Sequence, residues 1–176
     1  MLSELEETDE RNVAMESETV VSVRLPTDTQ ILIVRDFDAP RHLVYRAWTT
    51  PELVRRWWHA GRGEMTVCEI DLQVGGRWRY AMVTDDGDEV GFHGEYREIV
   101  PGERLVSTEV YEGIPDAETH AALDTLTLSE SDGRTTMTIL VEHPTKEGRD
   151  VHIASGMEDG LTDALDLLEE VAVSLR

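Results

Sequence analysis

Apolar and polar residues follow two different periods along this chain, one typical of strands and one of helices. Two β-branched runs, ETVVSVRL and TQILIVRDF, flank Pro26-Thr27-Asp28. They predict a strand, a turn and a second strand, or one long edge strand that breaks at the proline. Apolar residues then recur at helical spacing after Asp38-Ala39-Pro40 and again after Thr50-Pro51. Both sites combine a capping residue with an early proline, so we expect two short helices here.

After Gly61 the period falls to two. The run from Arg77 to Met82 alternates strictly. This places Trp78, Tyr80 and Met82 on one face of a strand and the two arginines on the other. Similar alternation predicts strands near residues 65–70 and over 89–100, 104–111, 121–129 and 134–143, with Gly- and Asp-rich turns between them. Short links of this kind favour antiparallel pairing.

From about Asp150 the helical period returns, and one broad apolar arc predicts a long amphipathic helix. Gly156 and Gly160 flank that arc, and each costs about 1 kcal/mol relative to Ala inside a helix. Either a neighbouring backbone approaches closely there, or the missing side chains leave room for a ligand. The predicted fold class is α+β, with a curved antiparallel sheet of about six to seven strands wrapped around the terminal helix.

The length of 176 residues indicates one domain. We interpret residues 1–18 as an acidic flexible tail and residues 19–176 as the domain itself. The N-terminal residues lack a basic segment followed by an apolar one, and no apolar run approaches the ~20 residues of a membrane span. We therefore expect a cytoplasmic protein that does not enter a membrane.

The charge balance excludes one class of partner. With 16 Lys and Arg against 37 Asp and Glu, the net charge is −21. A nucleic-acid binder needs positive charge to displace counterions, so we expect no nucleic-acid partner. The single cysteine, Cys68, rules out an internal disulfide or a cysteine-cluster metal site. The six histidines form no HExxH motif, so neither a metal nor a cofactor is expected.

Several motifs occur in an order that identifies a family. They are Phe37-Asp38-Ala39-Pro40, Ala47-Trp48-Thr49-Thr50-Pro51-Glu52, Trp57-Trp58, Asp71-Leu72-Gln73-Val74-Gly75-Gly76-Arg77-Trp78, Gly94-Glu95-Tyr96-Arg97-Glu98-Ile99-Val100-Pro101, Glu103-Arg104-Leu105-Val106 and Ser155-Gly156-Met157-Glu158-Asp159-Gly160. From about residue 29 to its end, the chain resembles the SRPBCC (START-like) superfamily. Within it, the chain is similar to the bacterial branch labelled "activator of Hsp-90 ATPase homologue-like".

This resemblance implies a helix-grip fold, in which an antiparallel sheet grips a C-terminal helix around a deep hydrophobic cavity. Relatives bind lipids, sterols, polyketides or other apolar molecules, and some are cyclases or aromatases. The branch takes its name from a eukaryotic co-chaperone domain. A homodimer is suggested by family analogy alone.

We accordingly expect the protein to bind a small hydrophobic or amphipathic molecule in a cavity between the sheet and the terminal helix. The residues expected to line that cavity are Trp58, Trp78, Tyr80, Met82, Phe92, Tyr96, Met137, Met157, Gly160 and Leu161. Three alternatives stay open. The same residues could form an ordinary packed core, the protein could be a cyclase- or aromatase-like enzyme acting on a polyketide-like substrate, or it could be a co-chaperone-like interaction module.

No residue is assigned a catalytic role from the sequence. Cys68, Ser107 and Ser155 lie in no nucleophile motif. Glu109 is expected to point outward into solvent, because Glu is almost never buried unpaired. If it pointed inward, burial would raise its pKa and give it an acid–base role. The strand alternation places His93 opposite in direction to Phe92 and Tyr96, so it is expected to face solvent.

Overall fold

The computed structural model describes residues 20–176. The predicted acidic tail, residues 1–18, lies outside the described residues. The strands are β1 (Ser22–Arg24), β2 (Gln30–Phe37), β3 (Gly63–Ile70), β4 (Arg77–Thr84), β5 (Glu89–Val100), β6 (Arg104–Tyr111), β7 (Ala122–Ser131) and β8 (Arg134–Glu142). The helices are α1 (Arg41–Thr49), α2 (Pro51–Val54), the 3₁₀ helix η1 (Ala117–His120), α3 (Lys146–Ala154) and α4 (Met157–Ser174).

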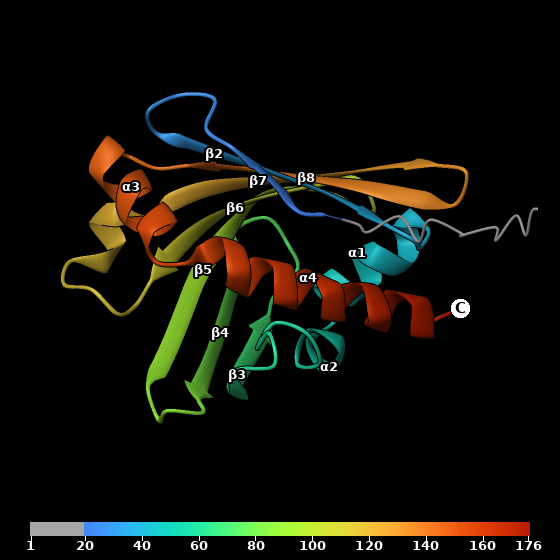
Figure 1. The fold of residues 1–176 in the computed structure, drawn as a ribbon, viewed down its shortest axis with the longest axis horizontal. Coiled ribbons are helices and arrows are strands. Elements are labelled where there is room, and N and C mark those ends of the chain that lie inside the picture. The colour runs from blue at the N-terminus through green and yellow to red at the C-terminus, as the bar shows by residue number, and fades with distance from the viewer. Residues whose placement is uncertain (1–19) are drawn as a thin grey trace, which may run out of the picture.

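The eight strands form one antiparallel sheet in the order β1-β2-β8-β7-β6-β5-β4-β3. The sheet curves around α4, which crosses its concave face, while α1 and α2 close one end (Figure 1). This is the expected α+β helix-grip architecture. The expected count of six to seven strands was too low: the N-terminal runs form two separate strands that pair antiparallel, Val23 facing Ile33.

Gly94 of β5 allows the backbones of β5 and β6 to approach each other closely. A β-carbon on Gly94 would overlap the carbonyl oxygen of Thr108 and would lie 2.6 Å from the indole nitrogen of Trp78. A glycine at such a strand position marks a close approach of two backbones. A side chain at this position would therefore force the two strands apart.

The C-terminal region departs from the predicted single helix. It forms two helices, α3 and α4, which are interrupted at Ser155 and Gly156. Gly156 has a φ of +77°, a left-handed conformation that glycine adopts without steric cost. Gly156 therefore ends a helix and does not lie within one, which explains why a residue without a side chain stands there.

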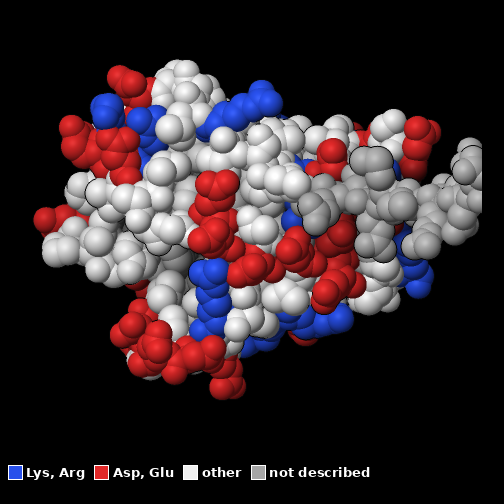
Figure 2. All heavy atoms as spheres, viewed as in Figure 1, with Lys and Arg blue, Asp and Glu red and all other residues white. Residues whose placement is uncertain are grey.

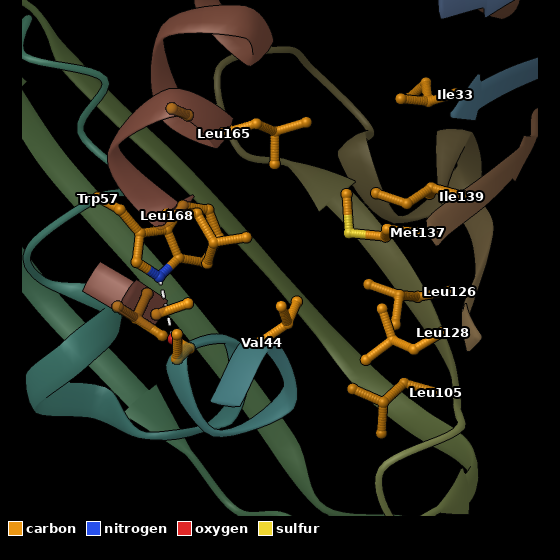
Figure 3. Close-up of a cluster of buried hydrophobic side chains, with 14 of the residues drawn as sticks. Ile33, Val44, Trp57, Leu105, Leu126, Leu128, Met137, Ile139, Leu165 and Leu168 are labelled. Atoms are coloured by element: carbon orange, nitrogen blue, oxygen red, sulfur yellow. Dashed lines mark hydrogen bonds between the residues drawn. The ribbon is translucent and has the colours of Figure 1, made fainter. Parts of the chain in front are cut away.

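A continuous apolar core joins the sheet to the C-terminal half of α4. Figure 3 shows Leu165 and Leu168 of α4 pointing toward Met137 and Ile139 of β8, with Leu126 and Leu128 of β7 beside them. Leu165, Leu168 and Met137 are completely buried. Burying apolar surface contributes about 25 cal/mol per Å², so this contact supplies most of the attachment of α4.

The outer side of α4 is acidic. In Figure 2 acidic side chains follow the line that α4 takes across the face of the molecule in Figure 1. The exposed acids of this helix are Glu158, Asp159, Asp163, Asp166 and Glu170. The helix is thus amphipathic as predicted, with its charges in water and its apolar arc toward the sheet.

Candidate functional site

Five aromatic rings form a connected wall on the concave face of β4, β5 and β6. The register places Tyr80 opposite Phe92, and the alternation puts Trp78 on the same face. Neighbouring ring centroids lie 4.9 Å apart for Trp78–Tyr80, 5.5 Å for Trp58–Tyr80, 5.8 Å for Trp58–Phe92 and 5.1 Å for Phe92–Tyr111. Aromatic pairs at these separations attract one another beyond simple area burial. Trp58, Trp78, Tyr80 and Phe92 were all among the predicted cavity residues.

The adjacent tryptophans Trp57 and Trp58 point in different directions, as their neighbouring positions require. Trp57 is buried in the closing end of the core, where its indole nitrogen donates a 3.0 Å hydrogen bond to the carbonyl oxygen of Ala47. It also packs against Trp48, at 4.9 Å between ring centroids. Trp58 is only partly buried and contacts the aromatic wall. Trp57 is thus structural, and Trp58 belongs to the candidate site.

Burial of the concave face changes along α4. Under the C-terminal half of the helix, the facing side chains are almost completely buried. Under its first turns, by contrast, the inward-facing side chains keep partial solvent access. Those side chains are Met82 and Phe92 of the sheet and Met157 and Leu161 of α4. Solvent therefore reaches this part of the concave face.

The remaining predicted cavity residues lie in different surroundings. Tyr96 is buried on the concave face of β5. Met137 is completely buried among the core residues opposite Leu165 and Leu168 (Figure 3). Gly160 faces Arg62, whose guanidinium nitrogen would lie 3.5 Å from a β-carbon there. Met137 thus belongs to the solid core, and Gly160 faces the loop that carries Arg62.

A pair of carboxyl groups lies on the same concave face, and the sequence reasoning missed it. Glu109 of β6 shares a face with Leu105, and Asp124 of β7 shares a face with Leu126. The two side chains lie close enough for each to shift the pKa of the other. The expectation that Glu109 points outward is therefore wrong. Strict alternation from the buried Leu105 to Ser107 and Glu109 was the signal that could have placed this side chain inside.

Burial is the main cause that raises the pKa of both carboxyls. For Asp124 the charge of Glu109 raises the pKa further, while for Glu109 the hydrogen bond from Asp124 partly opposes the rise. Each carboxyl disfavours ionisation of the other, because two neighbouring negative charges repel each other. No donor among the described residues reaches Asp124 Oδ1, which is buried. The concave face therefore contains an incompletely satisfied acidic pair.

The indole nitrogen of Trp78 is a second unsatisfied polar atom on this face. It is buried and has no acceptor among the described residues. It lies beside Gly94, which the register places between Trp78 on β4 and Glu109 on β6. A buried polar atom without a partner costs about 1–3 kcal/mol, so a ligand that supplied one would be favoured.

The convex face of the same strands carries a separate pocket of about 650 Å³. Its charged lining residues are Glu69, Arg77, Arg79, His93, Glu95, Arg97, Glu112 and Glu118. His93 thus faces away from the core, as predicted. Its two ring nitrogens lie 2.8 Å from a Glu112 oxygen and 2.5 Å from a Glu118 oxygen.

These contacts attach the loop that contains η1 to the sheet. Burial lowers the pKa of His93, but the hydrogen bonds that its ring donates to Glu112 and Glu118 outweigh this effect, and the net pKa is raised. Arg79 binds Glu112 through two hydrogen bonds of 2.9 and 3.0 Å and lowers the pKa of that carboxyl to about 2. The charged groups of Arg79, His93, Glu112 and Glu118 pair with one another, so this cluster has a structural role. We call these four residues the His93 clasp.

Two further histidines meet beside α3. His143 Nε2 and His152 Nδ1 lie 2.9 Å apart, and burial lowers both pKa values, that of His152 to about 4. Both rings are therefore neutral at pH 7. No group of three or more His, Cys, Asp or Glu side chains that could hold a metal ion occurs within residues 20–176.

The family model described as Activator of Hsp90 ATPase homolog 1-like protein matches residues 38–172. The chain belongs to this family. The match covers most of the described sheet, together with α1 to α4. The Activator of Hsp90 ATPase homolog 1-like family is a branch of the SRPBCC superfamily, as the sequence motifs indicated. None of the curated proteins compared with this chain matches it.

Solved structures support the same assignment of the fold. A crystal structure of a protein from Rhodobacter sphaeroides has a TM-score of 0.79 and 26% identity, covering 88% of this chain and 99% of the other. A solution structure of a protein from Arthrobacter aurescens has a TM-score of 0.78 and 27% identity, covering 89% and 93%. An AHSA1-like protein from Aeromonas hydrophila has a TM-score of 0.62 at 20% identity, covering 82% and 93%.

This family has a fold that binds ligands in general. Among the described residues, no helix is long and apolar enough to cross a membrane. The candidate site of this chain consists of the aromatic wall, the carboxyl pair of Glu109 and Asp124, and the partly accessible region beneath the first turns of α4.

Proposed function

We propose that this protein binds one small apolar or amphipathic molecule between the concave face of the sheet and the N-terminal half of α4. The single observation that carries the proposal is the gradient of burial along α4. Inward-facing apolar side chains keep partial solvent access at one end of the helix, although equivalent side chains at the other end are fully buried. Concave sites with apolar linings and a few polar groups are the usual form of a small-molecule site.

The lining fits this role chemically. The aromatic wall of Trp58, Tyr80 and Phe92 offers large rigid rings that a guest can pack against. Met157 and Leu161 supply flexible apolar surface from α4, and thioether side chains adapt to irregular shapes. The unsatisfied Trp78 nitrogen and Asp124 oxygen give the site two polar contacts that would orient a guest.

The experiment is displacement of an apolar fluorescent probe, N-phenyl-1-naphthylamine, from purified protein. Leu161→Trp adds bulk beneath the first turns of α4 and should abolish probe binding. Val173→Trp places the same side chain on the exposed face of the same helix and should leave binding unchanged. Probe binding that survives Leu161→Trp would contradict the proposed position. Native mass spectrometry of protein from its own host would then reveal a co-purified guest and the oligomeric state together.

A second candidate function is acid–base catalysis in the same site, on the cyclase or aromatase pattern. The inward position of Glu109 and its raised pKa favour it, since a catalytic acid works best when its pKa lies near the operating pH. Glu109→Gln should abolish turnover of a polyketide-like substrate while leaving its binding intact. Unchanged turnover in this variant would exclude Glu109 as the catalytic acid.

A further inference from the structure

The carboxyl pair of Glu109 and Asp124 lies on the concave face without a basic partner. The causes of both pKa shifts are burial and the other carboxyl, and no Lys, Arg or His side chain is among them. The same face of the sheet does carry one buried cation, Arg35. Arg35 is bound by Asp166 and Glu169 of α4. The described residues therefore supply this acidic pair with no compensating charge.

Such a pair is unfavourable in an otherwise apolar interior. A buried charge is tolerated when it is paired and hydrogen bonded, and it raises its pKa or destabilises the fold when it is not. Ser107 is the cross-strand neighbour of Asp124 on this face, yet Asp124 Oδ1 has no hydrogen-bond donor among the described residues. What the site lacks is a group that both donates hydrogen bonds and carries positive charge.

We propose that Glu109 and Asp124 bind the protonated amine of an apolar guest, so that the molecule carried by this protein is a cationic amphiphile and not a fatty acid. This inference rests on the proposed function, since it names the chemical class of guest for that same site. An ammonium group supplies three donors and a full positive charge, which matches two neighbouring carboxyls of which Asp124 Oδ1 has no donor among the described residues. Hydrogen bonds between ionised groups are shorter and about twice as strong as neutral ones.

Guests of other classes fit the pair less well. A fatty acid would bring a third carboxyl beside two that already repel each other. A neutral alcohol could donate one hydrogen bond to Asp124 and accept one from Trp78, but it leaves the charge of the pair unbalanced. The expected order of affinity at equal chain length is therefore amine, alcohol, carboxylate.

The test compares decylamine, decanol and sodium decanoate as displacers of N-phenyl-1-naphthylamine. The net charge of −21 attracts any cation to the surface, so the comparison is made at high salt. At about 0.5 M NaCl the screening length falls to about 4 Å, which removes long-range attraction but not contact inside the site. Decylamine should displace the probe at a concentration lower than decanoate by about tenfold or more.

The decisive variant is Glu109→Gln combined with Asp124→Asn, which keeps both shapes and removes both acids. It should bind decanol as before and lose the preference for decylamine. The matched control is Glu158→Gln with Asp159→Asn, which removes two exposed acids from the first turn of α4 and should keep the preference.

Each result decides between the two proposals. Decanoate that displaces the probe as well as decylamine, or a preference that survives in the Glu109/Asp124 variant, would overturn the assignment of a cationic guest. In either case displacement by decanol would leave the proposed function standing. If neither the probe nor any decyl compound binds the wild-type protein, the proposed function fails, and the inference fails with it.

Discussion

Arg35 Nη1 of β2 lies 2.6 Å from Asp166 Oδ1 of α4, and this ion pair joins a buried cation to an exposed acid. Arg35 is 1% exposed, whereas the Asp166 side chain is 58% exposed. Glu169 adds a second contact of 3.8 Å, and the guanidinium also lies over the Phe37 ring. The two partners thus differ in what each loses when the other is removed.

We predict opposite effects for the two sides of this pair. Asp166→Asn combined with Glu169→Gln should lower the free energy of unfolding by about 2–3 kcal/mol, because a buried guanidinium loses charged partners. Arg35→Met should leave it within about 1 kcal/mol of wild type, since the acids return to water and the methionine fills the space. Urea denaturation of both variants measures the difference.

The control for this pair is Asp163→Asn. Asp163 binds Arg62 at 2.8 Å, and both side chains are about half exposed, so the loss should stay below about 1 kcal/mol. An Arg35→Met variant less stable than the double acid variant would contradict this interpretation.

Two Gly→Ala substitutions should change stability in opposite directions. Gly94→Ala places a β-carbon against the Thr108 carbonyl and beside the Trp78 indole, so it should destabilise by about 3 kcal/mol or more. Gly160→Ala lies within α4, where its β-carbon meets only Arg62 at ordinary contact distance, and it should stabilise by about 1 kcal/mol. Thermal unfolding of both variants at one pH measures both effects. A Gly94→Ala variant with an unchanged melting temperature would show that the close approach of β5 and β6 does not need this glycine.

The sequence predicted most elements because periodicity reports which face of each element is buried. The strict alternation of Trp78, Tyr80 and Met82 located the aromatic wall, and the order of motifs gave the family. The break at Gly156 was missed because the apolar arc continues through both helices, and a left-handed residue leaves no trace in hydropathy. The sequence alone does not separate the first two strands, because Pro26 allows either a turn between two strands or a break within one long edge strand.

The site was harder to predict than the fold because it contains carboxyl groups that are buried, although such groups usually lie in solvent. Glu109 was expected in solvent on the general behaviour of glutamate, yet it lies inside beside Asp124, which is on another strand. Pairing across strands is set by register, which a single sequence does not reveal. Met137 was taken as a cavity residue because hydrophobicity alone does not distinguish a lining from a solid core.

The clasp around His93 predicts a pH dependence of stability. The folded-state pKa of His93 is raised, so its contribution is fully present below its unfolded value of about 6.5 and is lost as the pH rises through the folded value. The melting temperature of wild type should therefore fall over this range more than that of His93→Gln. The control is His42→Gln, because the His42 ring forms no hydrogen bond with Glu112 or Glu118. Parallel melting curves for wild type and His93→Gln would show that the clasp carries no stability.

Removing the Asp124 carboxylate should stabilise the protein and weaken its binding of the guest. The folded-state pKa of Asp124 is raised well above its usual value, so its contribution favours folding at low pH and is lost as the pH rises. Asp124→Asn should therefore raise the melting temperature at about pH 8 and have less effect at about pH 4. A rise of about 2–4 °C is expected for each kcal/mol gained. An Asp124→Asn variant that melts below wild type at the higher pH would mean that the carboxylate is stabilised by a charge from elsewhere.

The position of β2 between β1 and β8 has a consequence for synthesis on the ribosome. Gln30 pairs with Glu142 and Phe37 with Thr135, so the inner neighbour of this early strand is made about a hundred residues later. Pairings that close such long loops form slowly. Until translation has passed Glu142, the β2 edge that later pairs with β8 has no partner strand, and an unpaired edge of this kind invites pairing with other chains.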